Sequence, residues 1–205
     1  MSDLLRDLTT DLSDLLSFFV TIALLQNIVL TTGFGSSLVM HTVRKPKNIW
    51  PFTGVLTFFS VMTVLLAYPL DRWLGTAITN YWRPVILSGI TVALYVLITP
   101  ICRRWLPRLY SRVSSMLPVA AFNNLVFGIA LVANVKFHSG LGGIIGLAIG
   151  SCLAFGTISW ITAEGIERLD NPDMPDAFRG MPATLVYIGL VALALMGFTS
   201  DFKLI

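Results

Sequence analysis

Charged residues are scarce in this sequence. Only 12% of its 205 residues are charged and 55% are hydrophobic, whereas about a quarter of the residues in a soluble domain are charged. The mean hydropathy is +0.79. This shortage of charge excludes a soluble globular domain and indicates an integral membrane protein.

Cysteine and histidine are equally scarce, with two of each. Cys102 and Cys152 lie in different apolar runs without a CxxC spacing, and His41 and His138 lie at the edges of such runs. Metal centres need several thiolate, imidazole or carboxylate ligands together, so the sequence predicts no metal site and two inert, buried thiols. No Ser/His/Asp arrangement or phosphate-binding Gly-rich loop is present either, so we predict no catalytic residue.

Long uncharged runs fill most of the chain. Each is about as long as the ~20 residues that a membrane-spanning helix needs, and all formal charges fall between them. The runs are residues 15–40, 48–70, 84–102, 113–135, 137–163 and 180–200. We therefore predict an all-α membrane protein with six transmembrane helices, forming a single integral membrane domain over residues 1–205.

The basic residues predict how these helices are oriented. With six spans, one face carries both termini and five basic residues, namely Arg6, Arg72, Arg83, Lys136 and Lys203. The opposite face carries nine, namely Arg44, Lys45, Lys47, Arg103, Arg104, Arg108, Arg112, Arg168 and Arg179. The positive-inside rule therefore predicts that both termini lie outside the cytoplasm. Because no soluble basic domain is present, we expect the lipid bilayer and no nucleic acid as a partner.

Two of the predicted helices contain polar interruptions near their middle. Gln26 and Asn27 precede the glycine-bearing stretch 31–35 in the first, and Asn123 and Asn124 lie in the fourth. Amides at that depth are costly unless they face protein, water or a ligand. We predict that both helices are broken near the midplane and that these four amides are candidates for a polar ion pathway. A continuous helix with close-packed glycines remains an alternative.

The positions of these interruptions indicate an internal repeat. Residues 15–102 and 113–200 each form a group of three spans that opens with an interrupted helix. Three is an odd number, so the second group enters the membrane from the opposite face and the two repeats are inverted. In the fifth span, Gly142, Gly146 and Gly150 recur every four residues, which favours close helix packing.

Several short motifs resemble a known family. The matching segments are residues 26–30 (QNIVL), 117–131, 167–169 (ERL), 177–180 (AFRG) and 196–198 (MGF). In these the chain resembles the six-helix integral subunits of the Rnf and Nqr ion-translocating electron-transfer complexes, in particular the A-type subunit of Rnf and its Nqr counterpart. The resemblance implies a bacterial inner-membrane location, outward termini, a related six-helix membrane subunit as partner, and further subunits of the complex.

The chain departs from that family at its cofactor positions. Family members carry a cysteine in each interrupted helix, and these hold a [2Fe–2S] cluster together with two cysteines of the partner subunit. The corresponding positions here are Ser37 and Asn124. Iron–sulfur clusters need thiolate ligands in nearly all sites, so we expect this chain alone to bind no cofactor. The favoured function is a non-catalytic or accessory subunit of an ion-translocating oxidoreductase.

Two other functions fit the same residues. The pair of interrupted helices with amides at depth is also typical of a small-solute or ion transporter without redox chemistry. The absence of ionisable residues at depth makes proton coupling less favoured, since proton relays use Asp, Glu or His. A structural membrane anchor is the third possibility.

Overall fold

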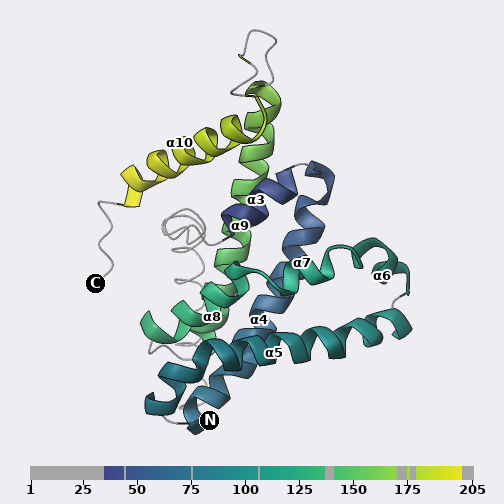
Figure 1. Ribbon diagram of the computed structural model, residues 1–205, viewed down its shortest axis with the longest axis vertical. Coiled ribbons are helices and arrows are strands. Elements are labelled where there is room, and N and C mark those ends of the chain that lie inside the picture. Colours follow the sequence, from purple (N-terminus) through teal and green to yellow (C-terminus); the bar gives the residue numbers. More distant parts are fainter. Residues whose placement is uncertain are drawn as a thin grey trace, which may run out of the picture.

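The computed structural model describes residues 35–43, 45–74, 76–105, 107–136, 141–169, 175 and 179–199. Within these ranges the regular elements are all helical (Figure 1). They are α3 (Ser36–Val43), the 3-10 helix η2 (Pro46–Asn48), α4 (Ile49–Leu74), α5 (Thr76–Trp105), α6 (Pro107–Val113), α7 (Leu117–Ala121), α8 (Asn124–Lys136), α9 (Leu141–Leu169) and α10 (Met181–Thr199).

Three stretches are long and apolar enough to cross a membrane: Pro46–Leu70, Trp82–Trp105 and Leu141–Arg168. Two shorter apolar stretches, Leu117–Val132 and Met181–Ala194, coincide with the predicted fourth and sixth spans. The prediction of an all-helical membrane protein is confirmed at this level. The six-helix arrangement in two inverted repeats stays a prediction, and residues 15–34 of the expected first span lie outside the described part of the chain.

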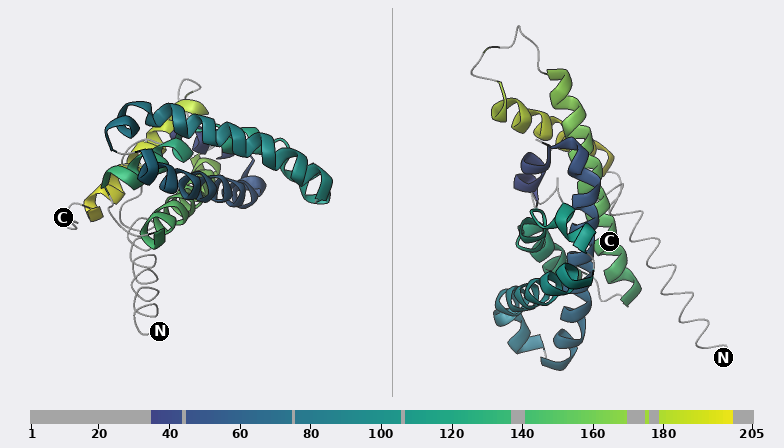
Figure 2. Two further views of the ribbon diagram at one scale, coloured as in Figure 1. Left: turned by 90° about the horizontal axis from the view of Figure 1, so that it is seen from below. Right: turned by 90° about the vertical axis from the view of Figure 1, so that its right-hand side faces the viewer.

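Helix α9 is the centre of the fold. It packs along α4 and also contacts α3, α8 and α10 (Figures 1 and 2). Thr53 of α4 faces Gly156 of α9, and Ser60, two turns further along α4, contacts Cys152, one turn earlier on α9. The two helices are therefore antiparallel.

Close approach of α4 and α9 depends on a glycine. A Cβ atom added at Gly156 would lie 2.9 Å from Thr53 Oγ1, which is closer than real Cβ contacts allow. One residue earlier on each helix, the rings of Phe52 and Phe155 pack with their centroids 5.9 Å apart. The predicted packing glycines Gly142, Gly146 and Gly150 lie on the same helix α9, and all three are buried.

The outer helices are far less covered. Helix α5 crosses α4 (Figure 1) and leaves Val96 and Leu97 more than 60% exposed. Helix α10 packs on the C-terminal end of α9, where the ring of Tyr187 occupies the space that a side chain at Gly165 would need. Its other side exposes Leu193 at 68%. These apolar surfaces suit lipid or a neighbouring subunit rather than water.

Prolines do not end the helices where the uncharged runs place the boundaries. Helix α4 continues through Pro69 to Leu74, and α5 begins at Thr76, so Pro84 and Pro100 both lie inside it. Each proline removes the backbone hydrogen bond to the carbonyl four residues earlier, that of Asn80 for Pro84 and of Val96 for Pro100, without ending the helix. The Ser88 hydroxyl donates to the carbonyl of Pro84 itself at 2.7 Å, one turn earlier on the helix, and so does not replace the bond that Pro84 removes. The helices therefore extend beyond the predicted spans, whereas the apolar stretches Pro46–Leu70 and Trp82–Trp105 agree with the predicted spans 48–70 and 84–102.

The α4–α9 contact yields the first test. Gly156→Ala should destabilise the protein by about 1–3 kcal/mol, because the added methyl group forces two packed helices apart. Gly89→Ala is the matched control, since nothing lies within 4 Å of the corresponding Cβ on α5, and it should change stability by no more than about 1 kcal/mol. Thermal denaturation of both variants in one detergent measures the difference. Equal melting temperatures would contradict the close approach at Gly156.

Candidate functional site

The fourth apolar segment is broken between α7 and α8. Phe122 leaves the helical region with φ −99° and ψ 65°, and Asn123 is buried within the break. The Asn123 amide nitrogen donates to the Ala120 carbonyl at 2.5 Å, and its amide oxygen accepts from the Val126 N–H at 2.9 Å. One side chain therefore satisfies the end of α7 and the start of α8 together.

Asn124 connects this break to a distant part of the chain. Its amide oxygen accepts a hydrogen bond from the backbone N–H of Gly35 at 3.1 Å, across 89 positions. Gly35 directly precedes α3, and its carbonyl accepts the helical bond from the Val39 N–H at 2.9 Å. Its φ of +87° is in the left-handed region that favours glycine. A Cβ there would also touch Leu125 at 3.4 Å.

The predicted site residues separate into three groups. Ser37 lies in the first turn of α3, two residues after Gly35. Because the Gly35 N–H bonds to the Asn124 amide oxygen, the structure places the segment of Ser37 beside Asn124. We call the contact between Gly35 and Asn124 the junction. Asn123 lies next to it, and its side chain forms hydrogen bonds with backbone groups of its own segment. Gln26 and Asn27 lie outside the described residues. The role of these four amides as an ion pathway stays a prediction.

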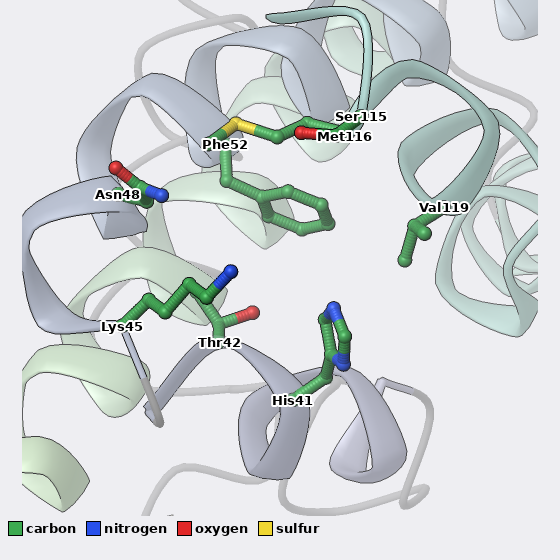
Figure 3. Close-up of a pocket in the computed structure, with 8 residues that line it drawn as sticks. All are labelled: His41, Thr42, Lys45, Asn48, Phe52, Ser115, Met116 and Val119. Carbon is green, nitrogen blue, oxygen red and sulfur yellow. The ribbon is translucent and has the colours of Figure 1, made fainter.

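A polar cavity lies at the other end of α3. Its volume is about 120 Å³, and Figure 3 shows its lining side chains, which come from α3, η2, the start of α4 and the turn into α7. They are His41, Thr42, Lys45, Asn48, Phe52, Ser115, Met116 and Val119. The basic residues near Lys45 are apparent in the sequence, but nothing in its pattern indicates that Ser115, Met116 and Val119 line a cavity with Lys45.

Comparison with known proteins identifies counterparts of almost the whole chain. The A-type subunit of the ion-translocating oxidoreductase complex of Pasteurella multocida is 26% identical over 189 residues, which is 92% of this chain and 98% of that protein. Proteins of the same name from Shigella flexneri and Salmonella paratyphi B are 27% identical over 94% of this chain and 100% of their own length. The chain is an Rnf/Nqr-like subunit of the A type. No protein-family model matches it.

The residues of this Rnf/Nqr-like subunit do not fit the family's iron–sulfur cluster. At the two cluster positions Ser37 offers a hydroxyl, and the Asn124 amide oxygen is already bonded to Gly35. Cys152 Sγ contacts Ser60 Oγ at 3.3 Å between α4 and α9, and Cys102 lines an apolar cavity of α4, α5 and α6. Neither thiol is at the junction. In the described part of the chain, no three His, Cys, Asp or Glu side chains are grouped to hold a metal.

The Asn124–Gly35 bond gives the second prediction. Asn124→Leu should leave membrane insertion intact but lower stability by about 1–3 kcal/mol, because the Gly35 N–H loses its acceptor in an apolar setting. Ser88→Leu is the control, since the Ser88 hydroxyl is exposed and bonds only to the carbonyl one turn earlier; we expect a change within about 0.5 kcal/mol. Thermal unfolding of the purified variants separates the two cases. If Asn124→Leu lowers stability no more than Ser88→Leu does, the Asn124–Gly35 bond does not stabilise the contact between α3 and α8.

Proposed function

We propose that this protein is the A-type integral subunit of an Rnf/Nqr-like ion-translocating electron-transport complex in the bacterial inner membrane. The observation that carries the proposal is end-to-end similarity to proteins named as the A-type subunit of such a complex, at 26–27% identity over 92–94% of this chain. The helical architecture with three apolar helices long enough to span a bilayer supports it.

The exposed apolar helices support a partner of the same kind. A related six-helix subunit, lipid and the remaining subunits of the complex would cover the outer faces of α5 and α10. Val96 of α5 and Leu193 of α10 are exposed at 62% and 68% in the isolated chain. Surfaces of this kind are typical of helices that pack against other membrane helices or lipid.

The orientation we propose has both termini outside the cytoplasm. The basic connections gather at one end of the described bundle, which supports this orientation. Lys45 and Ser115 line one cavity, so the α3–α4 connection lies beside the turn into α7. Because α4 and α9 are antiparallel, the C-terminal end of α9 with Arg168 lies at that same end. The sequence assigns nine basic residues to the face that includes these connections and five to the other, so the positive-inside rule favours the cytoplasmic side for this end.

The role of this subunit would be structural and ion-conducting rather than redox-active. A cluster shared between subunits would need thiolates at Ser37 and Asn124, and this chain has none there. The hydrogen bond from Gly35 to Asn124 instead joins the two segments. We therefore propose that the chain keeps the scaffold and ion pathway of the family, while the electron path uses centres held by other subunits.

Ion movement tests the complex-subunit function against a redox-independent transporter. In proteoliposomes that contain the native complex, ion uptake should require an electron donor such as NADH and stop when the soluble redox subunits are omitted. The same complex with Asn124→Leu should show reduced uptake, whereas Ser88→Leu should not. Uptake by the chain alone, unaffected by any donor, would instead establish a transporter without redox chemistry.

Metal content tests the proposed absence of a cluster. The chain purified with its six-helix partner should contain far less than one [2Fe–2S] equivalent of iron and acid-labile sulfide. The double variant Ser37→Cys/Asn124→Cys provides the positive control, because it restores thiolates at both family positions and should raise iron, sulfide and visible absorption. A stoichiometric cluster in the parent that survives Cys102→Ser and Cys152→Ser would overturn the proposal.

A further inference from the structure

The cavity beside α3 has the charge and shape of an anion site. Figure 3 shows the Lys45 ammonium and the His41 ring directed toward the space below Phe52. Asn48 adds an amide and Ser115 a hydroxyl. Thr42 contributes little, because its hydroxyl already donates to the Leu38 carbonyl at 2.7 Å.

The described elements that line the cavity carry no acidic side chain. The sequence has no Asp or Glu between Asp14 and Asp71, or between Asp71 and Glu164. The elements that line the cavity, α3, η2, the first turn of α4 and the turn into α7, are therefore free of acidic residues. Lys47 is exposed next to them. A cation would be repelled here, whereas an anion would gain from Lys45 and the neutral donors.

The volume limits which anion fits. At about 120 Å³, the cavity has room for a few water-sized groups, since one water occupies about 30 Å³ in the liquid. A tetrahedral phosphate group matches this size. One wall of the cavity is apolar and consists of Phe52, Met116 and Val119. It suits the carbon-bearing side of a phosphate ester better than a fully hydrated ion.

The cavity also lies at the end of an apolar helix. The membrane-length stretch Pro46–Leu70 begins among the residues that line it. Trp50, one residue into α4, is 53% exposed, and exposed tryptophan at a helix end is typical of the headgroup region. Phosphate esters are concentrated at this depth as phospholipid headgroups.

We propose that this cavity binds a phosphate group, supplied at this depth by the headgroup of an anionic phospholipid. Lys45 is the main charge contact, His41, Asn48 and Ser115 supply further hydrogen bonds, and Phe52 packs against the ester side. Such a ligand would join α3 to the turn into α7 at the end opposite to the Gly35–Asn124 hydrogen bond. The proposal goes beyond the electron-transport function and depends only on α4 spanning the bilayer.

Lipid retention in the intact protein tests this site. The full chain is purified from nanodiscs of phosphatidylcholine with or without phosphatidylglycerol, and bound lipid is counted by native mass spectrometry. Lys45→Gln should weaken phosphatidylglycerol retention about fivefold, the effect of one basic residue at a membrane surface. Lys47→Gln is the matched control, because Lys47 is exposed on η2 but does not line the cavity. Ser115→Phe fills the cavity without removing charge and should act like Lys45→Gln.

The outcomes separate the sources of phosphate and can overturn the site. Inorganic phosphate added before analysis distinguishes them: displacement of the lipid at millimolar concentration would assign the site to soluble phosphate compounds, and resistance would assign it to the lipid. Equal losses in Lys45→Gln and Lys47→Gln, with Ser115→Phe unchanged, would show diffuse surface attraction and overturn the proposal. So would retention of phosphatidylglycerol no greater than that of phosphatidylcholine. None of these results depends on electron transfer.

Discussion

The fold depends on satisfying backbone groups where an apolar helix is interrupted. A helix break frees N–H and C=O groups, and in a lipid-like environment each unsatisfied group costs several kcal/mol, about 2–7. Asn123 accepts from Val126 and donates to Ala120, so it covers both sides of the break between α7 and α8. Asn124 accepts from Gly35, which covers the N–H at the entry of α3. Two adjacent amides thus make the interruption tolerable.

This arrangement explains why α3 lies where it does. Gly35 at its start is held by Asn124, and the other end of α3 shares a cavity with the start of α7. The short helix therefore runs antiparallel to α7, and its buried residues Leu38 and Val39 belong to the hydrophobic core. Ser37 and Asn124, which the family resemblance equates with the cluster positions, lie in two segments that a hydrogen bond between neutral groups joins.

Composition and charge spacing were sufficient to predict the three long apolar helices, because a spanning helix can be recognised by its length and apolarity alone. The polar pair Asn123–Asn124 also predicted a break in the fourth segment, and α7 and α8 are separated there. Tertiary partners were not predictable. No local sequence pattern indicates that the Asn124 amide bonds to Gly35, or that Gly156 rather than Gly146 faces Thr53.

The distribution of buried surface distinguishes the central helix α9 from the outer helices α5 and α10. α9 is covered by α4, α3, α8 and α10, and it approaches α4 so closely that Gly156 cannot carry a side chain. Hydroxyls line this contact, where Ser60 meets Cys152. α5, by contrast, has mostly large apolar side chains directed outward. Lipid tails are as apolar as those side chains, so burial alone does not favour a protein neighbour there. A partner subunit on this face must therefore be recognised by close packing against its bare positions, of which exposed Gly89, with nothing within 4 Å of its Cβ site, is one.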